Sequence, residues 1–136
     1  AQPAPGVLAA IAQADLIILP PSNPIVSIGM ILRIPGIRAA IMAAKAPVVG
    51  VSPIIGGNPV LGMADKCLSA LGLETSATSV AQQYGDLLDA WLIADSDSDQ
   101  ISAVSELGIK CESAPLLMTD DQAAKEIAMR AIAMMR

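Results

Sequence analysis

Short apolar runs rich in β-branched residues alternate with segments of helical periodicity along this chain. Four runs have the length and composition of strands buried on both faces, at 15–19, 47–51, 90–94 and 109–112. Apolar residues recur at helical spacing over 5–14, 28–32, 35–44, 61–71, 75–84, 97–107 and 121–135. This alternation predicts a mainly parallel sheet with right-handed crossovers. We therefore expect residues 1–136 to form a single α/β unit, a three-layer Rossmann-like sandwich that is part of a larger domain.

Acidic residues fall at several predicted element ends. Asp97 or Ser98 is expected to cap the helix at 97–107, and Thr119 or Asp120 the last helix. The run at 95–99 alternates aspartate with serine, but it lacks the glycine and the distal glutamate of a calcium loop. We expect a solvated turn there, so that Asp97→Ala keeps nearly full activity.

Two further acids, Asp86 and Asp89, precede the strand at 90–94 and leave two interpretations open. Their carboxylates either hold the structure together or are directed into a functional site.

Composition excludes several classes of function. Hydrophobic residues make up 54% of the 136 residues and charged residues 15%, which excludes a disordered chain. The chain has no His, so it has no Ser-His-Asp or Cys-His catalysis and no imidazole ligand for zinc. One Trp and one Tyr give no stacking platform for single-stranded nucleic acid, and a net charge of -5 argues against nucleic-acid binding.

The charge is unevenly distributed along the chain. Residues 1–64 contain three bases and one acid, whereas residues 65–136 contain five bases and twelve acids. An anion site is therefore expected in the first half, although the acidic second half is equally typical of solvated helices.

Two features bear on cellular location. Cys67 and Cys111 lie far apart with no paired spacing, which favours free thiols rather than a metal motif or a disulfide framework. Prolines and glycines interrupt the uncharged stretches at 16–32 and 46–64, so neither is expected to span a membrane. No secretory signal is visible, and we expect a cytoplasmic protein.

Because the chain begins at Ala rather than Met, we expect it to be a piece of a longer protein.

Two loops follow the first two predicted strands, where ligands bind in open α/β sheets. The loop at 20–27 joins prolines to hydrogen-bonding side chains, and the helix opened by Ile28 and Gly29 favours an anion such as phosphate. An ordinary strand-to-helix turn explains the same residues equally well. The loop at 52–58 contains Gly56-Gly57, which lets the backbone approach a ligand. Neither loop matches a common nucleotide motif.

Together these loops resemble a known family. The segments ADLIILPPSNPIVSIG at 14–29, PGIR at 35–38 and APVVGVSPIIGG at 46–57 resemble the 2-phospho-L-lactate transferase family. YGDLLD at 84–89, Leu117-Met118 and Asp120-Asp121 follow in family order. The Pro-Ser-Asn-Pro and Ser-Pro-Ile-x-Gly-Gly motifs are specific as a pair.

The resemblance implies a cytoplasmic, Mg²⁺-dependent, homodimeric transferase of coenzyme F(420) biosynthesis. Such enzymes move a 2-phospholactyl group, or in bacteria a phosphoenolpyruvyl group, from a guanosine diphosphate-linked donor. The acceptor is the hydroxyl of the deazaflavin precursor Fo, and GMP leaves. By resemblance, the catalytic residues are Ser22, Asn23 and Ser27. The substrate-binding residues are Pro21, Pro24, Ile28, Gly29, Ser52, Pro53, Ile54, Gly56 and Gly57.

The chain departs from the family in two respects. Leu61 and Met63 stand where the family has Lys and Pro, which removes a cation from the neighbourhood of the phosphates. The resemblance covers the C-terminal half of the family alone, whereas the Mg²⁺-binding aspartates belong to the N-terminal half. We therefore assign no metal ligand and expect the isolated chain to have little or no activity.

Two alternatives remain open. One is a nucleotide-sugar-binding regulatory protein of the related gluconeogenesis-factor type, although such proteins carry a Gly-Pro-Gly-Ser type of loop in place of Pro-Pro-Ser-Asn-Pro. The other is an inactive fragment.

Overall fold

A four-stranded parallel sheet forms the centre of the computed structural model, which describes residues 1–136. The strands, in spatial order, are β1 (Ile17–Leu19), β2 (Val48–Val51), β5 (Ala90–Ala94) and β6 (Lys110–Ala114). All three neighbouring pairs are parallel. The four predicted strands and their parallel arrangement are thus confirmed.

Each predicted helix is also present. The α-helices are α1 (Val7–Gln13), α2 (Ile28–Leu32), α3 (Ile37–Ala43), α4 (Ala64–Ala70), α5 (Ala77–Tyr84), α6 (Ile101–Glu106) and α7 (Asp121–Ala133). There are two 3₁₀ helices: η1 (Gly85–Leu87) precedes β5, and η2 (Asp95–Gln100) precedes α6. No helix has both the length and the apolar composition needed to cross a bilayer.

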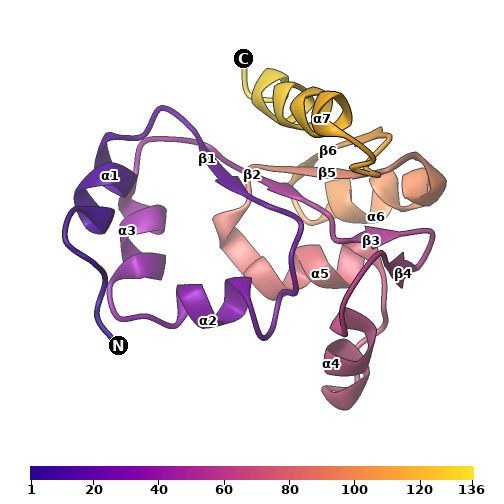
Figure 1. The fold of residues 1–136 in the computed structure, drawn as a ribbon, viewed down its shortest axis with the longest axis horizontal. Coiled ribbons are helices and arrows are strands. Elements are labelled where there is room, and N and C mark those ends of the chain that lie inside the picture. Colours follow the sequence, from indigo (N-terminus) through magenta and orange to yellow (C-terminus); the bar gives the residue numbers. More distant parts are fainter.

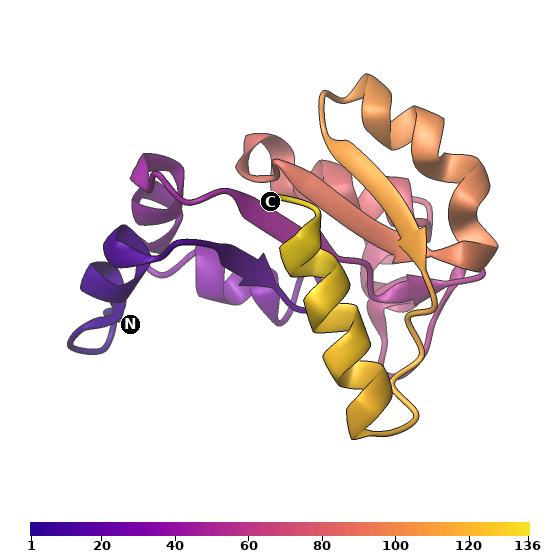
Figure 2. The same ribbon diagram turned by 90° about the horizontal axis from the view of Figure 1, so that it is seen from above.

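The helices form the outer two of three layers. Because the strand order does not reverse, right-handed crossovers place the connecting helices on one face of the sheet. Trp91 and Ile93 pack with α5 and α6 on that face, whereas Leu92 packs with Ile127 and Ala131 of α7 on the other. Figure 1 shows α7 alone above the sheet with α5 below it, and Figure 2 shows α7 (yellow) lying across the sheet. The expected α/β sandwich is confirmed.

The centre of the core is built around Trp91. Its ring lies over Gly50 of the neighbouring strand, where any Cβ would collide with the indole. The indole N–H donates to the Ala77 carbonyl at 3.1 Å, and the ring packs edge-on against Tyr84 at 5.8 Å between centroids. Burial raises the pKa of the Tyr84 hydroxyl above its usual value. This packing joins β2 and β5 to α5.

The structure corrects two local expectations. The segment predicted as a loop at 52–59 contains a small antiparallel hairpin, β3 (Ile54–Ile55) and β4 (Asn58–Pro59), whose strands are too short to leave a periodic pattern. Neither Asp97 nor Ser98 caps α6, because η2 intervenes and Gln100 precedes α6 without a capping bond. The last helix does begin as expected, since the Ala123 N–H donates to the Asp120 carboxylate at 2.8 Å.

Candidate active site

The two loops meet at the carboxyl edge of the sheet because β1 and β2 are parallel neighbours. Pro21 from the first loop and Ser52 and Pro53 from the second line one cavity of about 240 Å³. The rest of the lining is apolar and comes from the hairpin region and from the segment after β6: Ile55, Val60, Leu61, Leu116, Leu117 and Met118. The structure thus brings together segments that are far apart in the sequence.

The lining of this cavity contains no charged side chain. Leu61 is 89% exposed at its rim. An apolar cavity with an apolar rim suits the uncharged part of a ligand rather than a phosphate.

Asn23 holds the first loop in shape. Its side-chain oxygen accepts the N–H groups of Ile25 at 2.9 Å and Val26 at 3.1 Å. Its amide nitrogen donates to the Cys67 sulfur of α4 at 3.4 Å. This is the pattern of an Asx turn, so the side-chain oxygen is already occupied within the loop.

The start of α2 offers less to an anion than the sequence predicts. The N–H groups of Ser27 and Ile28 donate to the Asn23 carbonyl oxygen at 3.2 and 3.0 Å, and α2 has five residues, so its dipole is small. The Ser27 side chain makes no capping bond and leaves its hydroxyl available. Gly29 is required here, because a Cβ would collide with the Pro24 carbonyl oxygen.

A second cavity, of about 280 Å³, lies beside the same loop and carries the positive charge expected in the first half. Pro24 and Gly29 line it together with Arg33 and Arg38, neither of which was predicted to be a site residue, although Arg38 belongs to the PGIR motif. The Arg38 guanidinium donates to the Tyr84 carbonyl at 3.1 Å and lies 3.8 Å from the Asp86 carboxylate. The signal that could have found these arginines is their position just after the loop in the basic half of the chain.

Asp97 overturns the expectation of a solvated turn. Its side chain is 3% exposed, and its carboxylate oxygens accept the N–H groups of Gly56 at 2.9 Å and Gly57 at 3.1 Å. Asp97 therefore contacts the second loop directly, which no local pattern indicated. The available signal was its position just after β5, at the same edge as the two loops.

Several predicted binding residues have structural roles in the loops or the core. Ile28 and Ile54 are buried in the core, so their side chains are inaccessible to substrate. The Ser52 hydroxyl accepts the Ile54 N–H at 3.1 Å and donates to the Ile54 carbonyl at 3.2 Å. Gly56 and Gly57 form the exposed turn of the hairpin, with φ of 60° and 76°.

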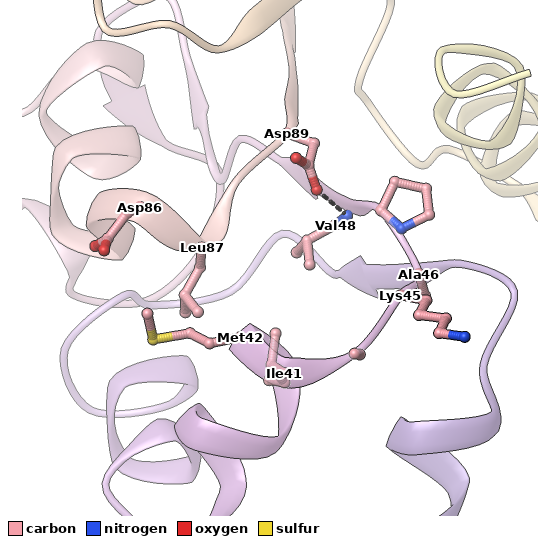
Figure 3. A pocket seen from close by; sticks show the side chains of 10 residues that line it. Ile41, Met42, Lys45, Ala46, Val48, Asp86, Leu87 and Asp89 are labelled. Atoms are coloured by element: carbon pink, nitrogen blue, oxygen red, sulfur yellow. Dashed lines mark hydrogen bonds between the residues drawn. The ribbon is translucent and has the colours of Figure 1, made fainter.

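Asp86 and Asp89, whose roles the sequence left open, lie near the amino ends of the strands. Both line a cavity of about 320 Å³ with Lys45 and Met42, located before the first residues of β2 and β5 (Figure 3). The Asp89 carboxylate accepts the Val48 N–H at 2.8 Å. Asp89 thus ties the amino ends of two strands together and lies away from the two loops.

The residues of this chain do not form a magnesium site. No group of three or more carboxylate, thiol or imidazole side chains lies close enough to hold a metal ion.

Comparison with known proteins decides the family. The family model described as 2-phospho-L-lactate transferase CofD matches residues 1–135. The chain belongs to the 2-phospho-L-lactate transferase family. Its loops after β1 and β2 carry the two motifs by which it resembles other members.

The relatives within this family include phosphoenolpyruvate transferases. The chain is 59% identical over 135 residues to the phosphoenolpyruvate transferase of Kitasatospora aureofaciens, matching 98% of this chain and 42% of that protein. It is 53% identical over 133 residues to that of Streptomyces coelicolor, with 97% and 42% covered. It is 50% identical over 125 residues to that of Mycobacterium tuberculosis, with 88% and 36% covered. The chain thus spans about two fifths of the length of these relatives.

Proposed function

We propose that this chain forms part of a transferase that moves a phosphoenolpyruvyl or 2-phospholactyl group from a guanosine diphosphate-linked donor to Fo. The family membership and the names of the relatives support the class of reaction. The observation that carries the proposal is the meeting of the two motif-bearing loops at one edge of the sheet. The uncharged cavity there suits a ring system, and the arginine-lined cavity beside the first loop suits phosphates.

In the proposed step, the acceptor hydroxyl oxygen attacks the phosphorus of the transferred group and loses its proton to solvent. The bond from that phosphorus to the oxygen bridging it to GMP breaks, and GMP leaves with the electron pair. The Ser22 and Ser27 hydroxyls, the Gly29 N–H and the Arg33 guanidinium are the groups of this chain that we assign to the phosphoryl oxygens. Such transfers are catalysed chiefly by positioning and charge stabilisation, which suits a site without histidine.

Three finer expectations from the family belong to the same proposal. They are Mg²⁺ dependence with ligands outside these 136 residues, a homodimeric assembly and a cytoplasmic location. Mg²⁺, when bound, would neutralise charge on the phosphates.

A chimera provides the test. Residues 1–135 replace the matching segment of the Kitasatospora aureofaciens enzyme, to which they are 59% identical. We expect Mg²⁺-dependent transfer of the phosphoenolpyruvyl group to Fo with GMP release, within about tenfold of the rate of the intact relative. The intact relative is the positive control, and the isolated 136-residue chain is expected to be inactive.

The outcomes distinguish the alternatives. A chimera that melts cooperatively but forms no product contradicts the proposal. Tighter binding of a UDP-sugar than of GDP would favour the nucleotide-sugar-binding alternative. Absence of saturable binding of nucleotide and of Fo would favour an inactive fragment.

A further inference from the structure

Asp97 is a buried acid to which the proposed reaction gives no role. It lies in η2, just after β5, whereas the neighbouring acids of the same run, Asp95 and Asp99, are exposed. No cation pairs with Asp97, and its oxygens instead accept two backbone N–H groups, those of Gly56 and Gly57. A buried carboxylate is costly unless it is hydrogen-bonded, so the two glycine N–H groups and Asp97 stabilise one another.

The hairpin that Asp97 holds has little structure of its own. β3 and β4 have two residues each, which is too few for an independently stable hairpin. At its base, Ser52 fixes Ile54 through two hydrogen bonds. At its tip, the turn is fixed to the rest of the protein by Asp97.

The same hairpin supplies one wall of the apolar cavity. Ile55 precedes the turn, Val60 and Leu61 follow it, and all three line the cavity together with Pro21. A shift of the turn would therefore move this wall relative to the first loop. Asp97 itself does not line the cavity.

We propose that Asp97 is a positioning residue that, through Gly56 and Gly57, fixes the hairpin wall of the apolar cavity and thereby sets the affinity for the uncharged portion of the ligand held there. The kinetic consequence rests on the proposed transferase function. The structural consequence, an ordered turn, does not.

The first test measures backbone amide exchange in the 136-residue chain by NMR. Asp97→Asn keeps the size of the side chain but replaces one accepting oxygen with an amide NH2 group, which cannot accept a glycine N–H. We expect the Gly56 and Gly57 amides to exchange about tenfold faster or more in this variant. The Ser52 amide, which donates to the Leu92 carbonyl at 2.9 Å, reports in the same sample that the core remains folded. Asp99→Asn, in the exposed part of the same run, is the matched control and is expected to change neither rate.

The second test uses the active chimera. Asp97→Asn is expected to raise KM for the acceptor about tenfold while kcat stays within about threefold, because the wall acts in binding. Asp99→Asn leaves both constants unchanged.

The two tests separate the possible failures. Unchanged exchange at Gly56 and Gly57 overturns the proposal. Faster exchange with an unchanged acceptor KM also overturns it, since Asp97 would then be structural alone. If the chimera is inactive, the proposed function fails, and the exchange rates still decide whether Asp97 holds the turn.

Discussion

The loops after β1 and β2 are held in contrasting ways at the same edge of the sheet. Asn23 bonds to amides two and three positions further along its own loop. The N–H groups of Gly56 and Gly57 donate to Asp97, which lies 41 and 40 positions further along the chain, after α4, α5 and β5. Apart from the bond of Asn23 to the Cys67 sulfur, the first loop is held by its own residues, whereas the turn of the second loop requires the sheet to be assembled. Variants that remove the contacts of one loop and leave those of the other intact test this difference.

The largest loss of stability is expected for Gly29→Ala, because Gly29 lies against the backbone of the first loop. The added Cβ would collide with the Pro24 carbonyl oxygen, and backbone cannot move aside as a flexible side chain can. We expect a loss of about 3 kcal/mol in unfolding free energy, measured by urea titration. Met30→Ala, at the exposed neighbouring position, is the control and should change stability by less than about 0.5 kcal/mol. A variant as stable as the parent would mean that α2 begins differently.

Asn23→Ala is expected to have the next largest effect, because it removes two hydrogen bonds within the first loop. We expect a loss of about 1–2 kcal/mol in unfolding free energy. In the active chimera we expect a transfer rate lower by about tenfold to a thousandfold, because loss of the turn would displace the Ser22 and Ser27 hydroxyls. Asn23→Asp retains the accepting oxygens for Ile25 and Val26 and should restore most of the stability. Unchanged kinetics in Asn23→Ala would remove this residue from the site.

We expect alkaline pH to lower the unfolding free energy through Cys111 in β6. Burial, followed by the charge of Glu112, raises the pKa of Cys111 to about 11 from a usual 9.0. The folded state thus favours the neutral thiol, so this stabilisation is complete below pH 9 and is lost as the pH rises through 11. The side chain is only half-buried, so we expect its share to be below about 1 kcal/mol. Urea titrations between pH 8 and 11 should show a smaller decline in Cys111→Ala. An equal decline would assign the effect to other groups, including Tyr84.

The smallest quantity expected is the coupling free energy between Asn23→Ala and Asp97→Asn, measured in the double variant. The two residues share no hydrogen-bond partner, so their losses in unfolding free energy should add to within about 0.5 kcal/mol. A coupling larger than about 1 kcal/mol would show that the two loops stabilise each other and are not held independently.

The same contrast explains which features the sequence predicts. The strands and helices are encoded in local runs such as AWLIA at 90–94, and the motif-bearing loops follow two of these strands. The cap at Asp120 was also predicted, because its partner Ala123 is three residues away. These features depend on neighbours in the sequence.

Features that depend on distant partners were missed or left open. Asp97 looks like a solvated acid in a polar run until β2 and β5 lie side by side and bring the Gly56 turn to it. Asp89 had two interpretations until its bond to the Val48 N–H placed it at the opposite edge. The apolar cavity combines segments that begin at 21, 52 and 116, and no local pattern joins them.

The burial of the single tryptophan gives the protein an intrinsic optical reporter. Trp91 is fully buried and bonded to Ala77, and it is the one indole in the chain. Its fluorescence emission should be blue-shifted in the folded protein and move to longer wavelength only when the core opens. A loop variant that changes ligand affinity without changing this emission has altered the edge of the sheet and left its centre intact.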